Sequence, residues 1–144
     1  MAHCTVQRRV EFAETDMAGI VHFSHFFRWM EAAEHAFFRQ IGLSIHTRQG
    51  DQVFGWPRVS CGFDYRKPLR FEDEIEVQLD LVRLGTSSLT YRCRVVRGGE
   101  LAAEGTSTCV CVEERAEGGF RKCPIPEAIR TRLPSPAEEK PPLA

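Results

Sequence analysis

The residues best suited to carry out a reaction lie together near the start of the chain, in the stretch DMAGIVHFSHFFRW that runs from Asp16 to Trp29. The carboxylate of Asp16 precedes a largely apolar helical stretch and could act as a nucleophile or as a general base. The unpaired N–H groups and partial positive charge of a helix N-terminus can polarise a carbonyl group and hold an oxyanion. Gly19 lies between the two and lets the backbone approach a ligand closely. The combination suits attack on an activated acyl group, although a loop aspartate more often serves as a turn or cap residue.

The helix that must hold this arrangement is the clearest element of the sequence. Its apolar residues recur every three or four positions and therefore share one face. They are Phe27, Met30, Ala33, Phe37 and Ile41, and the face is widened by Phe26, Trp29 and Phe38. Ser24 is the expected N-cap and Gly42 the expected stop. A helix this apolar needs a sheet to cover it.

Strands account for the remainder of the fold. Alternating, β-branched and aromatic residues predict strands over residues 5–13, 52–65, 71–84, 88–97 and 101–114. A short helix is expected within residues 125–133, and the proline-rich, charged segment 134–144 is predicted to be a flexible tail. One strand, a long helix and four further antiparallel strands, with no repeat, predict a single α+β domain over residues 1–133.

Composition and charge exclude several classes of protein. With 144 residues, 42% of them hydrophobic and 27% charged, the chain has the character of one ordinary globular domain. Its net charge of −1 gives no overall attraction to nucleic acid or to an anionic membrane. The first residues carry charges where a signal peptide would be apolar, and no run approaches the roughly 18 apolar residues of a membrane span. We therefore expect a cytoplasmic protein that neither binds nucleic acid nor inserts into a membrane.

Six cysteines and five histidines raise the question of a metal or redox site. Four of the cysteines fall within predicted strands, where a reduced thiol packs as a small hydrophobe; they are Cys61, Cys93, Cys109 and Cys111. The sequence has no C-x-x-C pair, no H-E-x-x-H and no glycine-rich phosphate loop. His22 and His25 are not the i, i+4 pair typical of a helical metal site, because His22 is expected to precede the helix. We predict buried reduced thiols, no metal site and no cofactor.

The stretch VEFAETDMAGIVHFSHFFRWMEAA closely resembles the 4-hydroxybenzoyl-CoA thioesterase family and the related YbgC-like acyl-CoA thioesterases of the hotdog superfamily. These proteins carry the pattern D-x-x-G-[IV]-V-[YWH]-[FH] at the entry to a central helix. The residues that occupy it here are Asp16, Gly19, Ile20, Val21, His22 and Phe23. The resemblance continues through the turn RKPL at 66–69 and the strand start FED at 71–73. The strand order predicted above is also that of the hotdog fold, in which a five-stranded antiparallel sheet wraps a long helix.

The resemblance implies an acyl-CoA thioesterase that hydrolyses a thioester to a free acid and CoA. Asp16 would be the catalytic carboxylate, as nucleophile or as general base on water. The backbone N–H of Phe23 would polarise the thioester carbonyl, and Gly19 would shape the loop between them. CoA belongs to the substrate, so no further cofactor is implied. The pantetheine arm would enter at a subunit interface of a homodimer, which could assemble further into a homotetramer.

The substrate-binding residues implied by the family are matched less closely. Many YbgC-like enzymes have His where this chain has Phe23, and here His22 comes one place earlier. Ile20, Val21 and His22 are carried over as candidates for contact with the substrate. For the CoA phosphates the candidates are Arg66, Lys67 and Arg83, because Ser87 and Ser88 occupy positions where the family often has a basic residue. Arg66 and Lys67 form a basic cluster with Arg70, which could equally be a solvated turn.

Other functions remain open from the sequence. A hotdog hydratase would need a different motif at the helix entry, with His beside an acidic residue. A non-catalytic protein that binds acyl-CoA or acyl carrier protein could keep the fold, but it would gain nothing from a carboxylate beside the thioester. Glu31 is an alternative catalytic residue, since another branch of the hotdog thioesterases uses a carboxylate on the helix.

Overall fold

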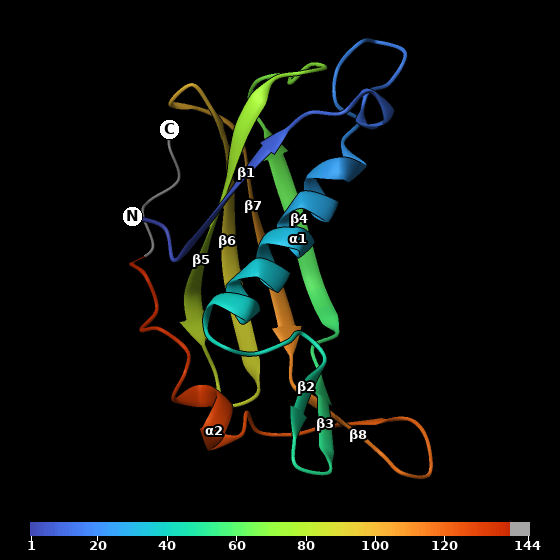
Figure 1. Ribbon diagram of the computed structural model, residues 1–144, viewed down its shortest axis with the longest axis vertical. Coiled ribbons are helices and arrows are strands. Elements are labelled where there is room, and N and C mark those ends of the chain that lie inside the picture. Colours follow the sequence, from blue (N-terminus) through green and yellow to red (C-terminus); the bar gives the residue numbers. More distant parts are fainter. Residues whose placement is uncertain (139–144) are drawn as a thin grey trace.

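One long helix lies across one face of a twisted antiparallel sheet (Figure 1). The computed structural model describes residues 1–138. The helix, α1, spans Ser24–Gln40. The sheet has the order β1-β5-β6-β7-β4. Its strands are β1 (Cys4–Arg9), β4 (Arg58–Tyr65), β5 (Glu74–Leu84), β6 (Ser88–Arg97) and β7 (Glu100–Val110). This is the predicted hotdog arrangement of one long helix and a five-stranded antiparallel sheet.

A second, smaller sheet lies at the end of the molecule nearest the C-terminus of α1. It has the order β2-β3-β8-β9. Its strands are β2 (Thr47–Gln49), β3 (Gln52–Gly55), β8 (Val112–Glu114) and β9 (Phe120–Lys122). Two short helices complete the chain, the 3-10 helix η1 (Phe12–Glu14) and α2 (Glu127–Arg130). The element η1 lies just before the loop that carries Asp16.

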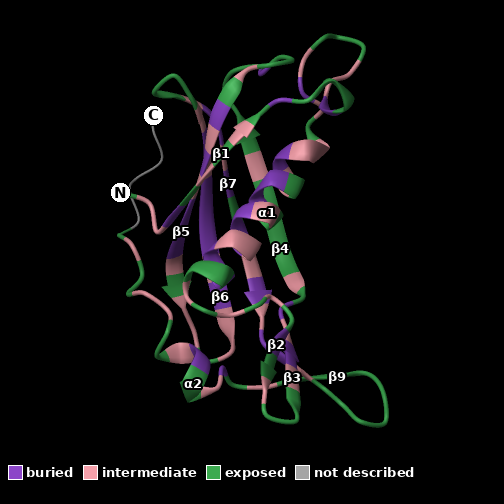
Figure 2. Cartoon of the chain, in the orientation of Figure 1, coloured by how far each residue is buried: buried purple, intermediate pink, exposed green. Residues whose placement is uncertain are grey.

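The core forms where the apolar face of α1 meets the sheet, as the buried positions in Figure 2 show. The helix contributes Phe26, Trp29, Met30, Ala33, Phe37 and Phe38, all at most 3% exposed. On β5, Ile75, Val77 and Leu79 alternate with outward-facing polar residues because successive strand residues point to opposite faces. Each large apolar side chain buried in this way contributes about 1.5–3 kcal/mol relative to an exposed one.

The structure corrects several predicted element boundaries. The first strand ends at Arg9 rather than at residue 13, and the strand predicted from residue 71 begins at Glu74. The run 52–65 is two strands separated by Trp56 and Pro57, because proline has no N–H to give to a ladder. The run 101–114 is likewise divided at Cys111 between β7 and β8.

Two predictions about individual residues are also wrong. The helix begins at Ser24, its N-cap is Phe23, and no side chain caps it. The prediction that the strand cysteines are buried holds for Cys93, Cys109 and Cys111 but fails for Cys61, which is exposed on the edge strand β4. Gly42 does end the helix, with the left-handed φ of +80° that glycine adopts most readily.

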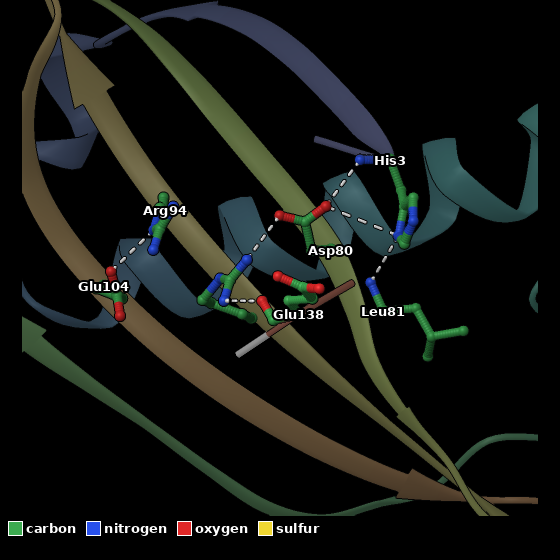
Figure 3. Close-up of polar contacts among 7 residues, drawn as sticks. His3, Asp80, Leu81, Arg94, Glu104 and Glu138 are labelled. Carbon is green, nitrogen blue, oxygen red and sulfur yellow. Dashed lines mark hydrogen bonds and ion pairs between the residues drawn. The ribbon is translucent and has the colours of Figure 1, made fainter. Parts of the chain in front are cut away.

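The first and the last described segments of the chain meet on β5 (Figure 3). Leu81 donates its N–H to Nδ1 of His3 at 3.0 Å and accepts the N–H of Ala137 at 2.7 Å. Asp80 accepts the N–H of His3 at 2.9 Å and a hydrogen bond from Arg92 at 3.1 Å. The first part of the segment predicted to be a flexible tail therefore packs on the sheet, while residues 139–144 lie outside the described part of the chain. Within residues 1–138 no helix has the length and apolar character needed to cross a membrane.

Candidate active site

The loop between η1 and α1 folds back on itself, which brings the predicted motif residues together (Figure 1). Thr15 and Val21 form an isolated antiparallel bridge. Inside that bridge the N–H of Asp16 bonds the carbonyl of Ile20, and the N–H of Gly19 bonds the carbonyl of Asp16, both at 2.9 Å. Gly19 has φ +79°, a left-handed conformation that costs other residues about 1–2 kcal/mol. The loop is thus a closed turn with Asp16 at its start.

The side chain of Asp16 is half-buried in a surface hollow of about 530 Å³. The other residues that line the hollow are Phe12, Thr15, Met17, Gly19 and Phe71. Oδ1 of Asp16 accepts the N–H of Ala18 at 2.8 Å, which fixes the orientation of the carboxylate. Within residues 1–138 nothing donates a hydrogen bond to Oδ2. One carboxylate oxygen is therefore held and the other remains available to a ligand.

The N-terminus of α1 supplies the second part of the predicted apparatus. Phe23 is the N-cap residue, and its carbonyl accepts a hydrogen bond from the hydroxyl of Tyr65 at 3.1 Å. No described residue accepts a hydrogen bond from the Phe23 N–H. The helix dipole adds a partial positive charge at this point. The Phe23 amide therefore lies at the helix N-terminus without an acceptor among the described residues.

The turn after β4 holds the loop from the other side. Val21 donates its N–H to the carbonyl of Leu69 at 2.8 Å. The next residue, Arg70, places its guanidinium beside the loop: a Cβ at Gly19 would lie 4.0 Å from Nη1 of Arg70. A positive charge therefore lies next to the Asp16 turn, where it could bind the phosphates of a ligand.

The other motif residues have different environments. Nδ1 of His22 lies 2.8 Å from Oγ of Ser24, and its ring packs on Phe23 with the two centroids 4.4 Å apart. Ile20 is half-buried. Val21 is 5% exposed and its side chain packs in the core.

The basic candidates do not all lie near Asp16. Arg66 and Lys67 follow β4 at the same end of the sheet, and both donate their N–H groups to the carbonyl of Ala102. Lys67 pairs with Glu100 at 2.7 Å. Arg83 is close to the far end of β5, at the opposite end of the sheet from the Asp16 loop. Within one protomer the structure brings Arg70, Arg66 and Lys67 to the Asp16 end, and not Arg83.

The two carboxylates of α1 differ in their surroundings. Glu31 is exposed, and its carboxylate lies 3.9 Å from Arg58. Glu34 is 2% exposed and paired with Arg58 at 3.1 Å. Burial raises the pKa of Glu34, and the charge of Arg58 partly offsets this effect. Glu34 is thus part of the core rather than of the Asp16 site.

Sequence reasoning missed the role of Glu14. This residue is 6% exposed and accepts a hydrogen bond from the indole N–H of Trp29 at 2.6 Å. No local pattern in the segment EFAETD, residues 11–16, distinguishes a buried glutamate from a solvated one. Arg70 belongs to the basic cluster that the sequence offered for contact with phosphates, and only the fold shows that it lies beside the Gly19 turn.

Residues 10–133 match the family model of the Thioesterase-like superfamily. The chain belongs to this superfamily. A 1,4-dihydroxy-2-naphthoyl-CoA hydrolase of Thermosynechococcus vestitus is 30% identical over 136 residues, which cover 92% of this chain and 90% of that protein.

Solved structures agree with this assignment. A hypothetical protein from Thermus thermophilus matches with a TM-score of 0.80 at 35% identity, over 90% of this chain and 96% of that one. A gentisyl-coenzyme A thioesterase matches with a TM-score of 0.72 at 25% identity, over 89% and 97% of the two chains. These similarities confirm the hotdog fold and the predicted thioester-hydrolase class of enzyme. They do not single out the YbgC-like branch.

Proposed function

We propose that this thioesterase hydrolyses acyl-CoA to a free acid and CoA, with Asp16 as the catalytic carboxylate. The proposal depends on one observation: the Asp16 carboxylate and the Phe23 amide lie at the same end of the fold. The half-buried carboxylate has a free oxygen, and the loop that holds it leads directly into a helix N-terminus whose Phe23 amide has no described acceptor.

The chemistry follows from these groups. The carboxylate attacks the thioester carbonyl carbon, or it removes a proton from a water molecule that does so. Negative charge then develops on the carbonyl oxygen, where the Phe23 N–H and the helix dipole stabilise it. The C–S bond breaks and CoA leaves as the thiolate, which takes up a proton. On the nucleophilic route the acyl group stays on Asp16 as a mixed anhydride, and water hydrolyses it to release the free acid and restore the carboxylate. On the general-base route the free acid forms directly. Gly19 allows the turn that keeps the carboxylate in place, and no metal or redox cofactor is needed.

Substrate binding is assigned to the surroundings of the turn. Arg70, together with Arg66 and Lys67, would contact the phosphates of CoA. The exposed rings of Phe12 and Phe71, whose centroids are 5.8 Å apart, offer an apolar surface beside Asp16. Two of the similar proteins act on 1,4-dihydroxy-2-naphthoyl-CoA and gentisyl-CoA, so aromatic acyl-CoA esters are the first substrates to test.

A cytoplasmic homodimer, able to assemble further into a homotetramer, is the form that we propose. Within residues 1–138, β4 pairs with β7 on one side and with no strand on the other. Val59 and Tyr65 are exposed on this edge strand, which would let a second copy add its own β4. Antiparallel pairing about a two-fold axis would bring a second subunit next to each Asp16 loop.

The proposal is tested by following the thioester absorbance of a panel of aromatic and aliphatic acyl-CoA esters. Direct absorbance is preferable to a thiol reagent because the six cysteines could react. Asp16→Asn should lower kcat by about 10²–10⁴-fold. Asp51→Asn, an exposed aspartate in the β2–β3 turn, is the matched control and should leave kcat unchanged.

Two outcomes would contradict the proposal in different ways. Equal turnover by wild type and Asp16→Asn would remove the catalytic role from Asp16. No turnover of any CoA ester, with CoA still bound, would favour a protein that only binds acyl-CoA or acts on acyl carrier protein.

A further inference from the structure

We propose that Glu14 is a positioning residue, which fixes the Asp16 turn against the body of α1. The inference rests on the proposed function, in which Asp16 and the Phe23 amide act on one substrate. Glu14 precedes Asp16 by two residues and does not itself line the hollow around it.

Both carboxylate oxygens of Glu14 are engaged. Oε2 accepts the indole N–H of Trp29 at 2.6 Å, and Oε1 accepts the backbone N–H of Glu11 at 2.8 Å. The guanidinium of Arg8 lies 3.6 Å from Oε2 and compensates part of the buried charge. A carboxylate held in this way has no free oxygen for a substrate, so it orients other groups and does not react.

The backbone of Glu14 fixes the other end of the same loop. Its carbonyl accepts the N–H of His22 at 2.9 Å, directly before the N-cap residue Phe23. The bridge between Thr15 and Val21 follows immediately inside this bond. Glu14 therefore joins three segments: its own η1, the chain that enters α1, and Trp29 within the helix.

The hydrogen bond from Trp29 to Glu14 affects the reaction because Trp29 is fixed within α1. Trp29 is 1% exposed and packs with Phe26, so its indole cannot move independently of the helix. The bond is directional, short and made to a charged acceptor, and such bonds are the strongest of their kind. The carboxylate of Asp16 and the amide of Phe23 lie on the short closed loop between Glu14 and the start of α1. A shift of that loop would separate the attacking group from the oxyanion donor and lower the rate of the chemical step.

The test is Glu14→Gln, with Asp80→Asn as the matched control. Asp80 is also a buried carboxylate that accepts one backbone N–H and one side-chain donor, but its partners are His3 and Arg92, away from the Asp16 loop. Each change converts a carboxylate into a carboxamide, whose NH₂ group must face one of the two donors. Glu14→Gln should lower kcat about tenfold or more while KM changes less than about twofold. Asp80→Asn should leave kcat unchanged, even if it lowers the melting temperature as much as Glu14→Gln does.

Trp29→Phe provides a second test of the same bond. It removes the indole N–H and keeps an aromatic ring, so it should lower kcat by a similar factor. The double variant should be no slower than the slower of the two single variants, because both remove one interaction. The acid limb of the pH–rate profile should stay in place, since Glu14 acts on geometry. A moved acid limb in Glu14→Gln would instead indicate that its charge acts directly on Asp16, and would overturn the proposal.

Hydrogen exchange measures the positioning without any turnover. Glu14→Gln should accelerate amide exchange in residues 15–23, and Asp80→Asn should not. Unchanged exchange in this segment, or an equal loss of kcat in both variants, would overturn the role of Glu14. Failure of the proposed function would look different: wild type and Asp16→Asn would hydrolyse the esters equally or not at all, while the exchange result would still decide whether Glu14 holds the loop.

Discussion

The carboxylate of Glu34 in α1 and the guanidinium of Arg58 at the start of β4 form a two-pronged pair, with Nη2–Oε1 and Nη1–Oε2 distances of 3.1 and 3.4 Å. Nη1 of Arg58 also donates to Oγ of Ser107 in β7 at 2.6 Å. The pair therefore joins the central helix to the edge strand through the interior. Because Glu34 is 2% exposed, its charge has little access to water and depends on Arg58.

Removal of Arg58 should destabilise the fold. Arg58→Met leaves the buried Glu34 without its partner and should lower the free energy of unfolding by about 3 kcal/mol. The control is Arg94→Met, because Arg94 pairs with Glu104 at 2.9 Å while both side chains keep access to solvent. That variant should lose about 1 kcal/mol or less. Urea denaturation of the two variants measures both values, and equal losses would contradict the special role of the buried pair.

The free energy of unfolding should also depend on pH through the titration of Glu34. Burial raises the pKa of Glu34 above its ordinary value of 4.5, so the folded state holds the proton more tightly than the unfolded chain does. The stabilisation from this tighter proton binding is complete below pH 4.5 and is lost as the pH rises through the raised pKa. The free energy of unfolding of the wild type, minus that of Glu34→Gln, should therefore fall as the pH rises from about 4.5 towards neutrality. A difference that stays level over this range and falls below about pH 4.5 would mean that Arg58 dominates and lowers the pKa instead.

Substitution of Gly19 should affect catalysis more than stability. Gly19→Ala must hold φ near +79°, and its new Cβ would lie at an ordinary distance of 4.0 Å from Arg70. The expected loss of stability is about 1–2 kcal/mol. Gly50→Ala is the control, since Gly50 has φ +61° and open space around it, far from Asp16. Both variants should melt at similar temperatures, while kcat falls only for Gly19→Ala. A similar fall in kcat for both would assign the effect to general destabilisation.

The attachment of the edge strand should depend on Gly105. A Cβ at this position of β7 would lie 2.5 Å from the carbonyl oxygen of Gly62 and 2.7 Å from the ring of Phe63, both in β4. Gly105→Ala should therefore push β4 away from the sheet and cost about 1–3 kcal/mol. Gly62→Ala changes the same strand pair with nothing within 4 Å of its new Cβ, and should cost less. Thermal melts compare the two variants, and equal melting temperatures would show that the strands adjust freely.

The sequence predicted the elements that have a strong period and missed those that depend on contacts distant in the chain. The helix was found because its apolar residues recur every three or four positions, and β6 because Ser88–Arg97 is bounded by clear turns. The break at Cys111 was missed because apolar Val110 and Val112 flank it, whereas Pro57 beside Trp56 was a local signal for the other break. At Cys111 no local pattern marks the place where the chain leaves one sheet and joins the other.

The residues of the site also divide into those that the sequence predicted and those that only the fold brings together. Asp16, Gly19 and Phe23 lie within one short segment, so that spacing and family resemblance were sufficient to bring them together. The contact of Arg70 with the Gly19 turn needs the bond from Val21 to Leu69, between residues far apart in the chain. The burial of Glu14 in η1 depends on the hydrogen bond from Trp29, which lies in the next helix, α1. These contacts are properties of the assembled fold.

Leu81 has His3 on its N–H and Ala137 on its carbonyl, and so the first and last described segments of the chain lie side by side. A short linker could join them, since backbone groups of both segments already reach the same strand residue. The chain could then be reopened in the exposed Gly98–Gly99 turn between β6 and β7, which interrupts no strand. Such a circular permutant would keep every contact of the Asp16 loop while β7 and β1 became the first strands of the five-stranded sheet to be synthesised.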